Sequence, residues 1–162
     1  MNMGRKLLIF GGVTLAAFGM LYGLHYAVFI EHQTLDRMGG SLARAFVSAA
    51  GRHVPEAHGY IATYALTKYN YVRQVDVHSH WIGLAMVMIV LGLAWDGIGF
   101  SERVRCWVAL AMLSGSLIFP LGVILQTVKH RELIGSGLAV AGSALVIMAL
   151  VAAAWGFARK AA

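Results

Sequence analysis

The chain has 162 residues, of which 59% are hydrophobic and only 12% are charged, and its mean hydropathy is +0.72. An average soluble domain is about 25% charged, so this composition excludes an ordinary water-soluble domain and predicts a protein embedded in a membrane. The net charge of +6 does not indicate nucleic-acid binding, because the thirteen Lys and Arg residues are scattered near the ends of apolar segments instead of gathering on one polar face.

Four apolar segments are long enough to cross a bilayer as helices, since a crossing needs about 20 such residues. They cover residues 7–30, 78–95, 104–128 and 133–157. We therefore expect an all-α integral membrane protein, in which residues 1–162 form a single domain with four transmembrane helices. Arg5 and Lys6 precede the first segment as in a secretory signal. Its apolar run is too long for a signal and has no clear cleavage site, so we expect a retained anchor.

The long connection between the first two spans, residues 31–77, is expected to be structured. Within residues 41–51, four apolar side chains recur at helical spacing: Leu42, Ala45, Phe46 and Ala49. Pro55 is placed to open a second short helix. Both are expected to be short amphipathic helices that lie in the membrane interface. The aromatic residues near this face would then form a belt at headgroup level, made of Tyr60, Tyr64, Tyr69, Tyr71 and Trp81.

Four spans place both termini and the loop 96–105 on one side of the membrane, and the long connection and the turn 129–132 on the other. The terminal side carries the larger number of basic residues near span ends: Arg5, Lys6, Arg103, Arg105, Arg159 and Lys160. Lys129 and Arg131 lie on the opposite side. By the positive-inside rule we expect both termini in the cytoplasm of a bacterial-type inner membrane, with the long connection external.

All seven histidines fall at the external face of this arrangement. They are His25 near the end of the first span, His32, His53 and His58 in the connection, His78 and His80 at the start of the second span, and His130 after the third. A histidine in or near a span is costly unless it pairs or binds a ligand, so this set marks a candidate site. His25 is the best candidate, because its neighbours are apolar. An imidazole that reaches the headgroups or bonds a backbone carbonyl explains His25 equally well.

His78 and His80 are two residues apart, which is about 200° of rotation on a helix, so they cannot both face the same bundle interior. If Asp76 caps the N-terminus of this helix, His78 lies in its first turn and His80 points into the core. A role of Asp76 as ligand or proton acceptor is the alternative. His130 lies between two basic residues and is either a solvated interfacial residue or a further ligand.

The chemistry that suits these histidines is metal or haem ligation, because imidazole binds haem iron, copper and zinc. Haem b is the first choice, since it needs only one or two axial histidines and apolar walls. Glycines in the spans supply room for such a group or, more often, close helix contacts. The expected cofactor-binding residues are His25, His80, His78 and His130, with His25, His80 and His78 as metal ligands. A copper site from the same histidines is the alternative; the single cysteine, Cys106, excludes a cysteine-based cluster within one chain.

The segment that opens the second span, HSHWIGLAMVMIVLGL at residues 78–93, resembles the His-x-His start of a span in small membrane relatives of the haem-copper oxidase subunit I superfamily. The resemblance covers about one span. In that superfamily such histidines include axial haem ligands, which implies a b-type haem on His78 or His80. Four spans are too few for the complete oxidase core, and the copper-centre histidine pair is not recognisable. Reduction of oxygen or nitric oxide is therefore not implied.

Three functions agree with these observations. The first is a haem b-binding, cytochrome-like subunit that passes electrons near the outer membrane face, between a quinol pool and a periplasmic electron carrier. The second is an accessory subunit without a cofactor, packed among the other membrane subunits of a larger respiratory or metal-dependent complex. The third is a copper-binding membrane subunit. The sequence has no recognisable nucleophile–base pair, phosphate loop or carboxylate cluster, so an electron-transfer or accessory subunit is expected rather than a stand-alone enzyme.

Overall fold

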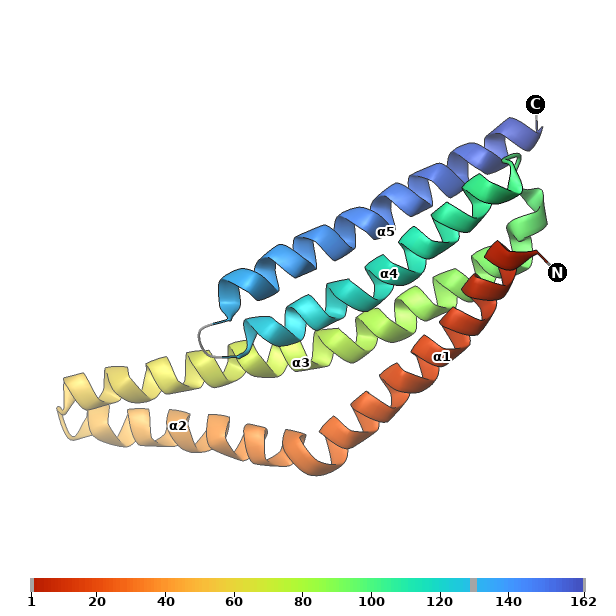
Figure 1. Ribbon diagram of the computed structural model, residues 1–162. Helices are drawn as coiled ribbons and strands as arrows, with labels where there is room; N and C mark the ends of the chain where they lie inside the picture. Colours follow the sequence, from red (N-terminus) through yellow and green to blue (C-terminus); the bar gives the residue numbers. More distant parts are fainter. Residues whose placement is uncertain (1, 129–130, 162) are drawn as a thin grey trace. The chain divides into compact units, whose positions relative to one another are not determined.

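The computed structural model describes residues 2–128 and 131–161, and the regular elements in these ranges are all helical (Figure 1). In chain order they are α1 (Met3–Tyr26), a π-helical turn η1 (Ala27–Glu31), α2 (His32–Ala50), α3 (Val54–Ala94), a 3-10 turn η2 (Trp95–Gly97), α4 (Glu102–Gln126) and α5 (Glu132–Ala161). Four helical segments in the described part of the chain are long and apolar enough to cross a membrane: Met3–Ala50, Val54–Gly97, Glu102–Gln126 and Glu132–Lys160. Each contains one of the four expected spans or most of it.

The chain divides into two compact units. The four-helix unit consists of Met1–Leu21 and Asp76–Ala162, and the hairpin unit consists of Tyr22–Val75. The four-helix unit holds most of α1, the second part of α3, and α4 and α5. The hairpin unit holds the end of α1, η1, α2 and the first part of α3.

The core of the four-helix unit is built around one stripe of α3. Val77, Trp81, Ala85 and Met88 recur at helical spacing and are almost fully buried. On α1, Gly12 permits a close approach to this stripe, because a Cβ added there would lie 2.9 Å from the backbone oxygen of Ala85. The contact of α1 with α3 therefore depends on a missing side chain, as in many membrane helix pairs.

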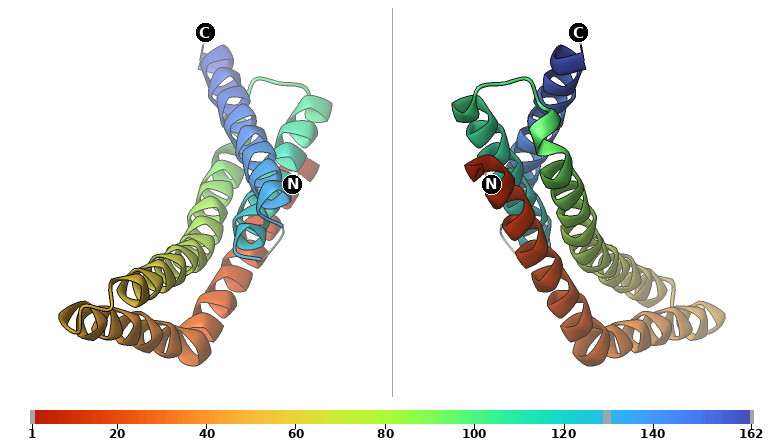
Figure 2. Two further views of the ribbon diagram at one scale, coloured as in Figure 1. Left: turned by 90° about the vertical axis from the view of Figure 1, so that its left-hand side faces the viewer. Right: turned by 90° about the vertical axis from the view of Figure 1, so that its right-hand side faces the viewer.

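Helices α4 and α5 are antiparallel and cross in close contact (Figures 1 and 2). The contact is made by glycines on both helices. A Cβ added at Gly122 of α4 would lie 2.4 Å from the backbone nitrogen of Ala139, and one added at Gly142 of α5 would lie 2.4 Å from that of Phe119. Gly137, in contrast, faces open space. Several span glycines therefore serve close helix contacts rather than providing room for a cofactor.

Asp96 ties the two ends of the chain together at one end of the four-helix unit. Its carboxylate accepts a hydrogen bond from the Arg5 guanidinium at 2.8 Å, and its backbone oxygen accepts one from the Lys160 ammonium at 2.5 Å. The Asp96 carboxylate is largely exposed, so the Arg5 pair adds little stability, about 0–1 kcal/mol. The network nevertheless places the start of α1 and the end of α5 at the same end of this unit, as four antiparallel helices require.

The hairpin unit pairs α2 with the first part of α3 in antiparallel fashion (Figure 1). Small side chains line the inner face of α2, where Ser41, Ala45 and Ser48 are buried at helical spacing. The Arg44 guanidinium lies 6.0 Å from the centre of the Tyr60 ring on α3, a cation–π contact between the two arms.

Polar contacts link the other end of the hairpin unit. The Tyr71 hydroxyl donates to the Glu31 carboxylate at 2.9 Å, and the Tyr22 hydroxyl bonds the Gln74 side chain. Tyr71 is therefore engaged with η1, a contact that the expected aromatic belt did not foresee. Glu31 is the last residue of the π-helical turn that joins α1 to α2.

The structure corrects three local expectations. The connection does not hold two short helices. Helix α2 has 19 residues, and α3, which begins next to Pro55, has 41 residues in all and continues into the second span. Asp76 therefore lies inside α3 and is not an N-cap. Trp81 is 1% exposed and belongs to the core, not to an interfacial belt. The helix continues through Asp76 because residues 60–80 contain no Gly or Pro that would end it before the span.

Candidate histidine site and apolar cavity

His80 is held in a defined orientation by its own helix. Its Nδ1 atom lies 2.5 Å from the backbone oxygen of Asp76, one turn earlier on α3. A carbonyl oxygen only accepts hydrogen bonds, so Nδ1 carries the proton in the neutral imidazole and Nε2 keeps its lone pair. Histidine ligands of metals are commonly fixed in this way, through the nitrogen that does not bind the metal. The geometry thus prepares Nε2 of His80 to accept a proton or bind a metal.

The ring of His80 packs against α4. Its centroid lies 4.7 Å from that of Phe119, and the two ring planes are nearly perpendicular at 82°. Phe119 is itself in contact with α5, because its backbone touches Gly142. The orientation of His80 therefore depends on the packing of α3, α4 and α5, and Phe119 is a site neighbour for which the sequence provided no signal.

His78 lies on the other side of the buried stripe of α3. Its side chain is half-buried, and its Nδ1 atom is buried without a hydrogen-bond partner among the described residues. This arrangement agrees with the expectation that His78 and His80 do not face the same direction. A buried ring nitrogen without a partner is costly, so His78 is the second imidazole of the four-helix unit that could bind a proton or a ligand.

The other candidate histidines are placed differently. His25 lies in the last turn of α1, in the hairpin unit; it is exposed, and its ring lies 5.3 Å from that of Phe29. Joint ligation by His25 and His80 stays a prediction. His130 lies outside the described residues. His32 and His53 are exposed, and their ring nitrogens lie 3.5 and 3.9 Å from the carboxylates of Asp36 and Glu56, respectively; His58 is also exposed.

No three His, Cys, Asp or Glu side chains among residues 2–128 and 131–161 are grouped closely enough to hold a metal ion. A copper or zinc site that takes three protein ligands of these types therefore has no counterpart in the described part of the chain. A haem makes a smaller demand, because one or two imidazoles suffice for its axial positions.

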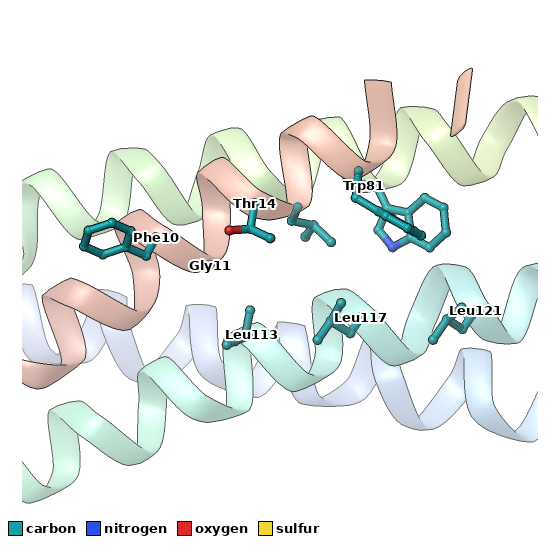
Figure 3. Close-up of a pocket in the computed structure, with 9 residues that line it drawn as sticks. Phe10, Gly11, Thr14, Trp81, Leu113, Leu117 and Leu121 are labelled. Carbon is teal, nitrogen blue, oxygen red and sulfur yellow. The ribbon is translucent and has the colours of Figure 1, made fainter. Parts of the chain in front are cut away.

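An apolar cavity of about 490 Å³ opens between α1, α3 and α4 (Figure 3). It is lined by Phe10, Gly11, Thr14, Leu15, Phe18, Trp81, Leu113, Leu117 and Leu121. Figure 3 shows Phe10 at one end, Trp81 and Leu121 at the other, and Thr14 between them. Its volume is in the range of small-molecule sites, roughly 300–1,000 Å³. Sequence patterns did not indicate this cavity, because its lining residues come from three separate helices.

The role of Asp76 can be tested directly. Because its backbone oxygen, and not its carboxylate, accepts the bond from His80, we expect Asp76→Asn to leave the environment of His80 unchanged. The measurement is the NMR chemical shift of the His80 ring in detergent-purified protein. A large change in this chemical shift would show that the carboxylate acts on His80, as the ligand or proton-acceptor alternative requires.

Comparison with known proteins found no matching protein family, no similar curated protein and no similar solved structure.

Proposed function

We propose that this chain is a membrane-integral, cytochrome-like subunit that binds haem b through His80. The observation that carries the proposal is the bond from His80 Nδ1 to the Asp76 carbonyl oxygen, which leaves Nε2 as the free ligand atom. The site also offers an apolar wall in Phe119. When bound, haem supplies one-electron redox chemistry. The chain's own part is to hold the imidazole in one orientation and one tautomer and to keep its surroundings apolar.

The second axial position and the setting of the subunit are part of the same proposal. His25 is the first candidate for that position and His78 the second, with His130 as a further ligand. The subunit would lie in a bacterial-type inner membrane with both termini cytoplasmic, and would pass electrons between a quinol pool and a periplasmic carrier. The arrangement of basic residues at the chain's two ends supports this orientation.

One experiment tests the proposal on the wild-type protein. We expect the protein purified with native lipid to show a Soret band in the oxidised state, which shifts and sharpens with added α and β bands after reduction with dithionite. Acid extraction should then release non-covalently bound haem b. Protein that carries neither haem nor other metal after such a purification would contradict this proposal and the copper alternative together.

An accessory subunit without a cofactor is the second candidate, and one observation favours it. The hairpin unit exposes large apolar side chains outside the expected spans, with Phe46 70%, Val47 74% and Leu66 63% exposed. Apolar surface of this kind is typical of contact with another protein or with a membrane. Co-purification of further membrane subunits with haem-free protein would support this candidate over the first.

A further inference from the structure

We propose that the cavity between α1, α3 and α4 binds the ring of a prenyl quinone, with the Thr14 hydroxyl as hydrogen-bond donor to a quinone carbonyl. The binding itself does not depend on haem. The role of the bound quinone as redox partner of the histidine site rests on the proposed function above.

Thr14 is the only threonine of the chain whose hydroxyl makes no hydrogen bond among the described residues. The other four donate to a backbone carbonyl three or four residues earlier: Thr34 to Ile30, Thr63 to Gly59, Thr67 to Thr63 and Thr127 to Ile124. Back-bonding of this kind is the usual way in which a helix satisfies a threonine hydroxyl. The Thr14 hydroxyl is therefore available in a cavity whose other lining side chains are almost all apolar.

The depth of Thr14 selects the ligand class. It lies seven residues into the expected first span, which begins at Leu7, or about 10 Å along the helix. The hydrocarbon core is about 30 Å thick, so Thr14 lies well below the ester carbonyls of phospholipids, which stay at the interface. A ligand that accepts this hydrogen bond would have to carry a carbonyl into the hydrocarbon core. A quinone ring with an isoprenoid tail has this property.

The shape of the cavity agrees with a flat ring followed by an apolar chain. Phe10, Phe18 and Trp81 provide aromatic surfaces, and Leu113, Leu117 and Leu121 form a row one turn apart along α4 (Figure 3). Trp81 directly follows His80 on α3, and the cavity and the candidate histidine site belong to the same compact unit.

The test is binding of a labelled short-chain prenyl benzoquinone to the purified full-length protein in nanodiscs. We expect saturable binding by the wild type. Thr14→Val keeps the shape of the side chain and removes the hydroxyl, so the Kd should rise about three- to tenfold, the value of one neutral hydrogen bond. Leu117→Trp fills the cavity and should abolish saturable binding.

Thr63→Val is the matched control, because it removes a hydroxyl that already bonds its own helix, and its Kd should equal that of the wild type. Equal binding by wild type and Thr14→Val would overturn the hydrogen-bond assignment, and absence of saturable binding by the wild type would overturn the quinone site. The quinone site would also be overturned by a phospholipid that co-purifies with the wild type, is absent from Leu117→Trp and is not displaced by added quinone. Absorption spectra of the same samples report haem separately, so failure of the quinone site and failure of the haem proposal are distinguishable.

Discussion

Replacement of His80 by alanine should remove the Soret band of the purified protein or shift it strongly. The variant loses the imidazole whose Nε2 is set free by the bond to Asp76, and the rest of α3 keeps its helical backbone. Without this imidazole the chain would hold haem more weakly, and haem would be lost during purification. The measurement is the ratio of Soret to protein absorbance in oxidised and reduced samples.

Two comparisons separate ligation from misfolding. Added imidazole should restore the band in His80→Ala, because it can occupy the space of the missing side chain. His58→Ala, an exposed histidine of the hairpin unit, should leave the spectrum unchanged. Spectra of His25→Ala and His78→Ala identify which of the two supplies the second axial position. A normal spectrum in His80→Ala would exclude His80 as a ligand.

Substitution of Gly142 by alanine should destabilise the contact of α4 with α5. The new Cβ would lie 2.4 Å from the backbone nitrogen of Phe119, and a backbone atom cannot move aside without separating the helices. Such overpacking costs about 1–3 kcal/mol. We expect the melting temperature in detergent to fall by roughly 5 °C. The measurement is size-exclusion chromatography or intrinsic fluorescence of heated samples. Because Phe119 faces His80, a haem spectrum should shift in the same variant.

Gly137→Ala is the matched control on the same helix. No atom lies within 4 Å of a Cβ added at Gly137, so this change only improves helix propensity and should leave stability equal or higher by up to about 1 kcal/mol. Equal melting temperatures for the two variants would show that the helices separate easily and that the glycine contact is not tight in solution.

The sequence by itself determined the number and place of the apolar helices. Each run of about 20 apolar residues must satisfy its backbone hydrogen bonds internally in a membrane, and a helix does this within one segment, so neighbours elsewhere in the chain hardly matter. The start of α3 near Pro55 was also predicted correctly, because the restricted φ of proline acts locally. The opposite directions of His78 and His80 followed from the geometry of one helix.

Only the tertiary structure decided what surrounds these histidines. The contact of His80 with Phe119 and the cavity between α1, α3 and α4 depend on how separate helices approach one another, and glycines such as Gly12 and Gly142 set these approaches. The sequence position of a glycine does not predict which other helix its backbone will contact. The free hydroxyl of Thr14 could not be predicted from the sequence either. A threonine in a helix is expected to bond its own backbone, and only the structure shows that Thr14 does not, whereas Thr34 and Thr63 do.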